Sequence, residues 1–176
     1  MNIKTLTGLL ILFFLVTAAG CAAPPPYFPG VRYAPEPALV VVPQPGKQVP
    51  TLSVMASVIG IRRGDPHANV PPAVEIRLRF ENNGPVAVSF EPRTLDLVTG
   101  SLQEFEPVET RPAPPFQLST GQSQTVSAFF PFPPGFHPRM PSLDALRLRW
   151  TVTIDNQPVS QTVSFYRATP MYYASP

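Results

Sequence analysis

Residues 73–90 read AVEIRLRFENNGPVAVSF, and their pattern of polar and apolar side chains predicts the fold of the chain. In the first half, every second position is apolar: Val74, Ile76, Leu78 and Phe80. Successive side chains of a β-strand point to opposite faces, so this period of two predicts a strand with one buried face. A second, shorter alternation follows at Val86, Val88 and Phe90.

The polar sequence Asn82-Asn83-Gly84-Pro85 links these two alternations, and two arrangements of it stay open. A hairpin that pairs Phe80 with Val86 needs a three-residue loop, with Gly84 in the left-handed conformation. An arch would instead carry the chain from one sheet to another. Both arrangements keep the apolar side chains in one buried layer.

Further alternations run through residues 51–167, and none has the 3.6-residue period of a helix. The expected strands cover residues 51–63, 74–81, 86–90, 94–98, 101–108, 122–130, 143–154 and 159–165. The last of these is expected to return with Val163 opposite Trp150. Seven to eight short strands separated by turns predict an all-β, antiparallel sandwich, with a small barrel as the alternative.

Two short motifs and one long strand point to a family of domains. NNGPVAV at residues 82–88 and LSTGQSQTV at residues 118–126 precede the long strand 143–154. Together they resemble bacterial immunoglobulin-like domains of extracytoplasmic proteins, over residues 51–167. Antibody-type domains have paired cysteines, whereas Cys21 is the single cysteine of this chain. The resemblance therefore implies an immunoglobulin-like sandwich held by an apolar layer around Trp150.

The first 21 residues have the features of a secretion signal. Lys4 precedes an apolar run at residues 6–16, and small residues then lead to Cys21. AAGC at residues 18–21 resembles the lipobox of bacterial lipoproteins, although Ala18 stands where that family prefers Leu. The resemblance implies that residues 1–20 are removed, that Cys21 is lipidated, and that acyl chains hold the protein in the membrane. The alternative is an ordinary secreted protein with a free cysteine.

The resemblance to lipoproteins also implies a location. The residue after the cysteine is Ala22. In that family, a residue other than Asp at this position directs a lipoprotein to the outer membrane, where it faces the periplasm. The expectation is a protein of the bacterial cell envelope that is anchored to the membrane by lipid.

Residues 21–50 are expected to be the lipidated cysteine and a proline-rich linker. Proline favours an extended polyproline II chain, so residues 22–50 could reach roughly 90 Å as a tether. The run Leu39-Val40-Val41-Val42 interrupts the prolines and is an alternative candidate for an edge strand. The sandwich is then expected at residues 51–167, with a C-terminal tail at residues 168–176.

Composition and motifs argue against several classes of function. The net charge of +2 gives no electrostatic reason to expect nucleic acid. The sequence has no nucleophile elbow, no phosphate-binding glycine loop and no His-Glu-x-x-His motif, so we expect no enzyme and no cofactor. His137 and Met140 alone are too few to hold copper, so no metal site is expected. Outward arginines at 77, 79, 147 and 149 would form a basic patch if their strands were neighbours.

Residues 129–141, FFPFPPGFHPRMP, are the candidate site for a protein partner. Aromatic residues in a proline-stiffened loop lose little entropy on binding and are frequent hot spots of interfaces. The candidate binding residues are Phe129, Phe132, Phe136, His137 and Met140. In the alternative interpretation these rings fold back and cap one end of the sandwich.

The sequence thus favours a membrane-anchored, non-catalytic binding or assembly module whose partner is a protein of the cell envelope. Two other functions stay open: a proteinase-inhibitor-like immunoglobulin domain, and a periplasmic metal carrier or envelope enzyme.

The apolar layer around Trp150 generates a first prediction. Replacing Trp150 with Ala should lower the free energy of unfolding by roughly 3–5 kcal/mol, because a buried ring would leave a cavity. Urea denaturation of the two proteins measures this difference, and superimposable curves would contradict a core position for Trp150.

Overall fold

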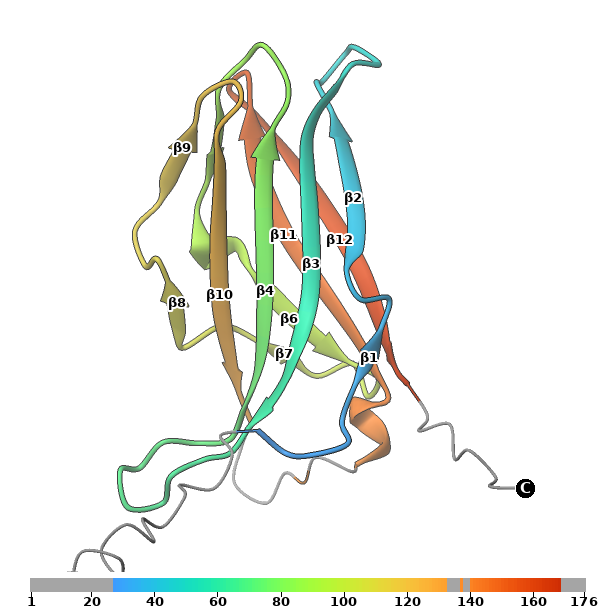
Figure 1. Cartoon of the computed structure of the whole chain (residues 1–176), viewed down its shortest axis with the longest axis vertical. Helices are drawn as coiled ribbons and strands as arrows, with labels where there is room; N and C mark the ends of the chain where they lie inside the picture. Colours follow the sequence, from blue (N-terminus) through green and yellow to red (C-terminus); the bar gives the residue numbers. More distant parts are fainter. Residues whose placement is uncertain (1–26, 133–136, 138–139, 169–176) are drawn as a thin grey trace, which may run out of the picture.

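The computed structural model describes residues 27–132, 137 and 140–168, which form two antiparallel sheets packed face to face (Figure 1). The five-stranded sheet has the order β2 (Ala38–Pro43), β3 (Pro50–Arg62), β4 (Ala73–Asn82), β10 (Ser123–Pro131) and β8 (Glu109–Arg111). This arrangement confirms the predicted all-β antiparallel sandwich.

The second sheet contains seven strands. Its main path is β1 (Tyr33–Ala34), β12 (Gln157–Arg167), β11 (Ala145–Ile154), β5 (Val88–Phe90) and β9 (Phe116–Leu118). In addition, β6 (Asp96–Thr99) pairs with β11, and β7 (Glu104–Phe105) pairs with β6. Two 3₁₀ helices, η1 (Pro92–Thr94) and η2 (Pro141–Leu143), lie in the connections. In the part of the chain that the structure describes, no helix has the length and hydropathy needed to cross a bilayer.

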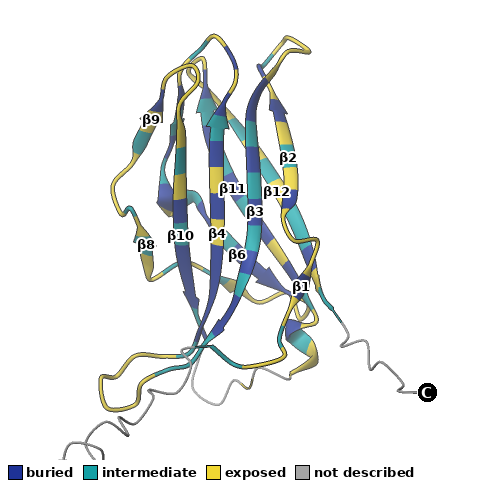
Figure 2. Cartoon of the chain, in the orientation of Figure 1, coloured by how far each residue is buried: buried dark blue, intermediate teal, exposed yellow. Residues whose placement is uncertain are grey.

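The facing surfaces of the two sheets form one apolar core. On β4, Val74, Ile76, Leu78 and Phe80 are all fully buried, as their alternation predicts. Trp150 on β11 is 1% exposed and belongs to the same core, which confirms its expected position. Alternating buried and less buried residues are visible along the long strands in Figure 2.

The link after β4 is an arch, and the hairpin interpretation is wrong. β4 pairs with β3 and β10 in one sheet, whereas β5 pairs with β11 and β9 in the other. Phe80 therefore lies opposite Val54 and Gln124 rather than Val86. The chain changes sheets here while keeping its apolar side chains in the shared core.

Gly84 is required in this arch for a different reason from the one expected. The left-handed conformation is absent there, but the backbone of Gly84 passes directly over Thr51. A Cβ atom on Gly84 would lie 2.5 Å from Cγ2 and 2.9 Å from Cα of Thr51. Only glycine permits this approach, which places the amide of Gly84 3.0 Å from the carbonyl oxygen of Thr51.

The side chain of Asn82 holds the arch together from within. It is fully buried, and its Nδ2 donates to the carbonyl oxygens of Val86 at 2.8 Å and Leu118 at 2.9 Å. Its Oδ1 accepts a hydrogen bond from the amide of Gly84 at 3.0 Å. Backbone groups where a chain leaves a sheet lack partners from a neighbouring strand. The side-chain amide of Asn82 supplies hydrogen bonds to three such groups.

Aromatic rings fill the core beneath the arch. Phe80 from one sheet lies 4.5 Å from Phe90 of the other, measured between ring centroids. Phe116 on β9 contacts both, at 5.8 Å from Phe80 and 5.5 Å from Phe90. Tilted and edge-on contacts of this kind stabilise aromatic pairs beyond the burial of their area.

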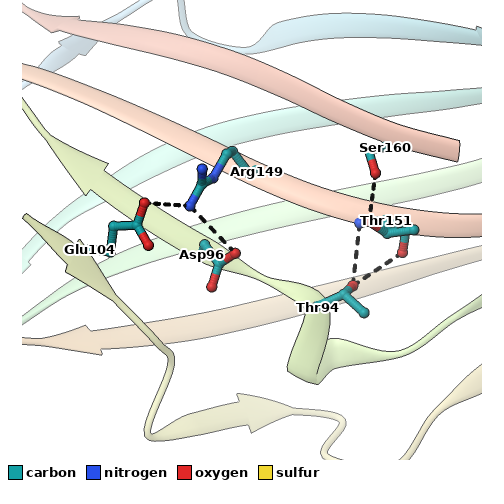
Figure 3. A network of polar contacts seen from close by, with 6 residues as sticks. All are labelled: Thr94, Asp96, Glu104, Arg149, Thr151 and Ser160. Carbon is teal, nitrogen blue, oxygen red and sulfur yellow. Dashed lines mark hydrogen bonds and ion pairs between the residues drawn. The ribbon is translucent and has the colours of Figure 1, made fainter. Parts of the chain in front are cut away.

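β11 is paired along one edge by two separate strands, and a threonine closes the gap between them. β6 pairs with residues 146–149 and β5 with residues 152–154, with η1 between these strands. Oγ1 of Thr94 donates to the carbonyl oxygen of Thr151 at 3.1 Å and lies 3.3 Å from its amide (Figure 3). The side chain of Thr94 thus replaces the missing strand partner.

The hairpin of β11 and β12 has a tighter turn than the sequence predicted. Asp155 and Asn156 have φ values of 53° and 61°, and Ile154 pairs with Gln157. Two consecutive left-handed residues form the type of turn that matches the twist of a hairpin. Trp150 therefore lies opposite Gln161, and the expected pairing with Val163 is off by two residues, which keeps the same face inward.

Residues 33–43 belong to the sandwich, which corrects the expected linker over residues 21–50. The valine run forms β2 and pairs with β3, so the edge-strand interpretation is confirmed. Tyr33 and Val42 are buried in the core, and the hydroxyl of Tyr33 donates to the carbonyl oxygen of Leu143 at 2.8 Å. Proline is tolerated at sheet edges, so the high proline content of this segment is compatible with edge strands.

The arch generates the second prediction. Replacing Asn82 with Ala should lower the free energy of unfolding by roughly 2–4 kcal/mol, because buried backbone groups lose their partners at about 1–3 kcal/mol each. Replacing the neighbouring exposed Asn83 with Ala is the matched control and should change it by less than about 0.5 kcal/mol. Equal effects of the two substitutions in urea denaturation would contradict this role of Asn82.

Candidate functional site

The described structure begins six residues after Cys21, the predicted lipidation site, which lies outside the described residues. Residues 27–32, which we call the strap, run across the end of the sandwich where β3 and β10 end and β4 begins (Figure 1). The strap is bound to β3 through a bridge between Tyr27 and Arg62. The amide of Phe28 also donates to the carbonyl oxygen of Ile61 at 2.9 Å.

A bulge in β3 makes room for the strap. The register with β4 shifts between Val58 and Gly60, and Gly60 has a φ of +154°. A Cβ atom at Gly60 would lie 3.3 Å from Cδ1 of Tyr27, so the ring of Tyr27 rests where a side chain would otherwise project. Glycine at the bulge therefore both permits the backbone geometry and leaves space for this ring.

A buried carboxylate holds the other end of Tyr27. Glu75 lies on the outer face of the five-stranded sheet but is only 4% exposed, and its Oε2 accepts a hydrogen bond from the Tyr27 hydroxyl. Nη2 of Arg77 lies 3.6 Å from its Oε1. Burial raises the pKa of the Tyr27 hydroxyl above its usual value, and the hydrogen bond to Glu75 raises this pKa further.

Phe129 lies beside this carboxylate, in the row across the sheet that contains Glu75 and Gly60. Its ring points away from the core, as predicted, but it is only 6% exposed. The guanidinium groups of Arg62 and Arg111 cover it, at 5.5 Å and 5.3 Å from the ring centroid. The expectation that Phe129 is free to bind a partner is therefore wrong, because these cations pack on its ring.

Phe132 is also buried, at the same end of the sandwich. It is 3% exposed, its ring lies 5.7 Å from that of Phe105, and its amide donates to the carbonyl oxygen of Pro72. Phe132 belongs to the core cluster, whereas Phe129 lies on the opposite face of its sheet, so the two form no common platform. At Phe132 the structure matches the alternative interpretation, in which the loop caps the sandwich.

Of the remaining predicted binding residues, the structure describes His137 and Met140. His137 is exposed, and its amide lies 3.3 Å from Sδ of Met140 in a turn that leads into η2. Met140 is 37% exposed. Phe136 lies outside the described residues.

A groove with largely apolar walls opens between the strap and the loop of residues 63–72. Its volume is about 760 Å³, and its lining includes Phe28, Arg63, Val70, Pro71, Pro72 and Phe132. We call it the strap groove. The guanidinium of Arg63 lies 5.3 Å from the ring centroid of Phe28. Nε of Arg63 is buried and has no hydrogen-bond partner among the described residues.

The loop that forms one wall of the strap groove has internal hydrogen bonds that fix its shape. Asp65 and Val70 each donate their amide to the other's carbonyl oxygen, at 2.8 Å and 2.9 Å. Oδ1 of Asp65 accepts from the amides of His67 and Ala68. Val70 is 39% exposed, so the loop presents an apolar side chain at the groove.

The outward arginines do not form one basic patch. Arg77 and Arg79 lie on β4 and Arg147 and Arg149 on β11, in different sheets. Arg149 is paired with Glu104 at 2.8 Å and lies 3.7 Å from Asp96 (Figure 3). Within the described residues, no three His, Cys, Asp or Glu side chains come close enough together to hold a metal ion.

Sequence reasoning identified one lining residue of the strap groove, Phe132, and missed Phe28, Arg63 and Val70. The signal that was available is the sequence Tyr27-Phe28 among prolines, since aromatic residues are uncommon in a tether exposed to water. The contact with the bulge could not be predicted, because Gly60 lies within a strand pattern that continues on both sides of it.

The strap generates the third prediction. Replacing Tyr27 with Phe should lower the free energy of unfolding by about 1–3 kcal/mol, because a buried carboxylate loses a hydrogen bond. The folded pKa of Tyr27 lies above its unfolded value of about 10, so its stabilisation is complete below that pH and disappears as the pH rises through the folded value. The difference in tyrosinate absorbance between the wild type and the variant, followed against pH, measures this pKa. A titration midpoint at the usual tyrosine value would show that the hydroxyl is exposed.

Comparison with known proteins gives structural similarity alone. No family model matches the chain, and no curated protein matches it. The yjhA protein from Bacillus subtilis is similar over 62% of this chain and 80% of its own, with 17% identity and a TM-score of 0.37. A structural-genomics target, SoR45, is similar over 71% of this chain and 90% of its own, with 12% identity and a TM-score of 0.35. At these scores, neither similarity carries an inference about the function of this chain.

Proposed function

We propose that this protein is a lipid-anchored lipoprotein of the bacterial cell envelope, facing the periplasm from the outer membrane, and that it acts as a non-catalytic binding or assembly module. The observation that carries this proposal is the sequence AAGC at residues 18–21, which follows an apolar run with a single preceding charge. Acyl chains at Cys21 would hold the protein stably in the membrane, since two or more chains bind far more strongly than one.

The described domain supports a binding role within this proposal. Its two sheets form a sandwich with a single core, and the strap groove offers a concave surface with largely apolar walls. Pockets with apolar walls and a small number of polar groups are typical binding sites. We assign the sandwich to the immunoglobulin-like type, in keeping with the sequence resemblance and with the arch that carries the chain between the sheets.

The fourth prediction tests the anchor. In a bacterial host, the mature protein should begin at Cys21, and its mass should exceed that of the bare chain by a diacylglycerol group and an amide-linked acyl chain. Replacing Cys21 with Ser should abolish incorporation of labelled palmitate, because the thiol that forms the thioether is lost. Mass spectrometry that finds an unmodified Cys21 in the wild-type protein would refute the proposal.

A further inference from the structure

We propose that the strap groove binds one acyl chain of a bilayer phospholipid, with Arg63 beside the lipid phosphate. This inference rests on the proposed lipid anchor and adds a second, non-covalent contact with the same membrane. Three observations carry it: the position of the strap, the apolar walls of the groove, and the charges around it.

The length of chain before the strap determines which end of the sandwich faces the membrane. Six Cα–Cα steps separate Cys21 from Tyr27, and together they span at most roughly 20 Å. Tyr27 is fixed to β3 and to Glu75, so an anchor at Cys21 cannot move far from this end of the domain. The strap groove opens at the same end, because Phe28 forms part of its wall.

The walls of the groove suit a hydrocarbon chain. Phe28 comes from the strap, Val70 from the loop and Phe132 from the residue after β10, and prolines 71 and 72 complete the apolar surface. Val70 is 39% exposed although it has an apolar side chain. Apolar side chains of this kind enter the boundary between headgroups and acyl chains when a protein lies on a bilayer.

The charges at the groove suit a phosphate group. Arg63 lines the groove, and its guanidinium packs on Phe28 at the groove wall, which places a positive charge there. Arginine presents a planar set of donors that fits phosphate oxygens. Arg32, which does not line the groove, is exposed on the strap at the same end of the sandwich, while the carboxylate of Asp65 accepts two amides of its own loop. A surface with this charge favours the phosphates of anionic lipids.

Photo-crosslinking tests the proposal with the lipidated, mature protein. The protein is reconstituted into vesicles of phosphatidylethanolamine and phosphatidylglycerol that contain phosphatidylglycerol with a diazirine in its acyl chain. After irradiation, mass spectrometry should find crosslinks at Phe28 and Val70. Crosslinks distributed equally over both ends of the sandwich, or confined to residues before Tyr27, would overturn the proposal.

Matched variants sharpen this test. Val70→Asp should reduce crosslinking in the groove several-fold, because it places a charge beside the acyl chain. Val49→Asp is the control: Val49 is 49% exposed in the turn between β2 and β3, at the opposite end of the sandwich (Figure 1), and its substitution should leave crosslinking unchanged. Arg63→Gln should also reduce crosslinking, through loss of the phosphate contact. Equal crosslinking yields from all three variants and the wild type would refute the binding of an acyl chain in the strap groove.

The same samples separate failure of this inference from failure of the proposed function. The mass of the mature protein reports lipidation of Cys21 independently of crosslinking. A lipidated protein without crosslinks in the strap groove would refute only the binding of an acyl chain there. An unlipidated protein that still crosslinks there would refute the anchor and retain the groove.

Discussion

One buried amide, the side chain of Asn82, holds the place where the chain passes from one sheet to the other. It bonds to backbone groups of Val86 and Gly84 in the arch and of Leu118 in β9 of the second sheet. The arch needs a hydrogen-bond partner of this kind, because a segment that crosses between sheets has no neighbouring strand to pair with its buried backbone N–H and C=O groups. The aromatic cluster of Phe80, Phe90 and Phe116 lies in the core below this point, where the two sheets meet.

A second constraint acts at the other end of the sandwich, where the strap crosses the end of β3. The bulge at Gly60 provides the space, and the buried carboxylate of Glu75 provides the hydrogen-bond acceptor. The strap is thereby part of the domain, and the chain between it and Cys21 is only residues 22–26. Under the proposed function, this arrangement holds the domain close to the membrane, with the strap groove toward the lipid.

The alternation of apolar residues predicted the main strands and the core because a period of two is a property of strands themselves. The buried face of β4 and the burial of Trp150 follow directly from this alternation. The strands β1, β8 and β9 contain two or three residues each, too few to show a period. They are positioned by contacts with distant segments, which a local pattern does not contain.

The candidate site was harder to predict for the same reason. The sequence FFPFPPGFHPRMP predicted that Phe129 points away from the core, but not that Arg62 and Arg111 cover it. Those two arginines come from β3 and β8, far apart in the sequence and joined only by the sheet. The choice between hairpin and arch was likewise open, because both keep the same side chains in the core.

The central claim, that the strap shortens the tether and places this end of the domain at the membrane, can be tested by neutron reflectometry. The lipidated protein would be measured on a supported phospholipid bilayer, with contrast variation between lipid and protein. The account predicts that protein density begins within roughly 20 Å of the headgroups, the most that six residue steps can span. A hydrated gap approaching the roughly 90 Å of a free tether over residues 22–50 would contradict it.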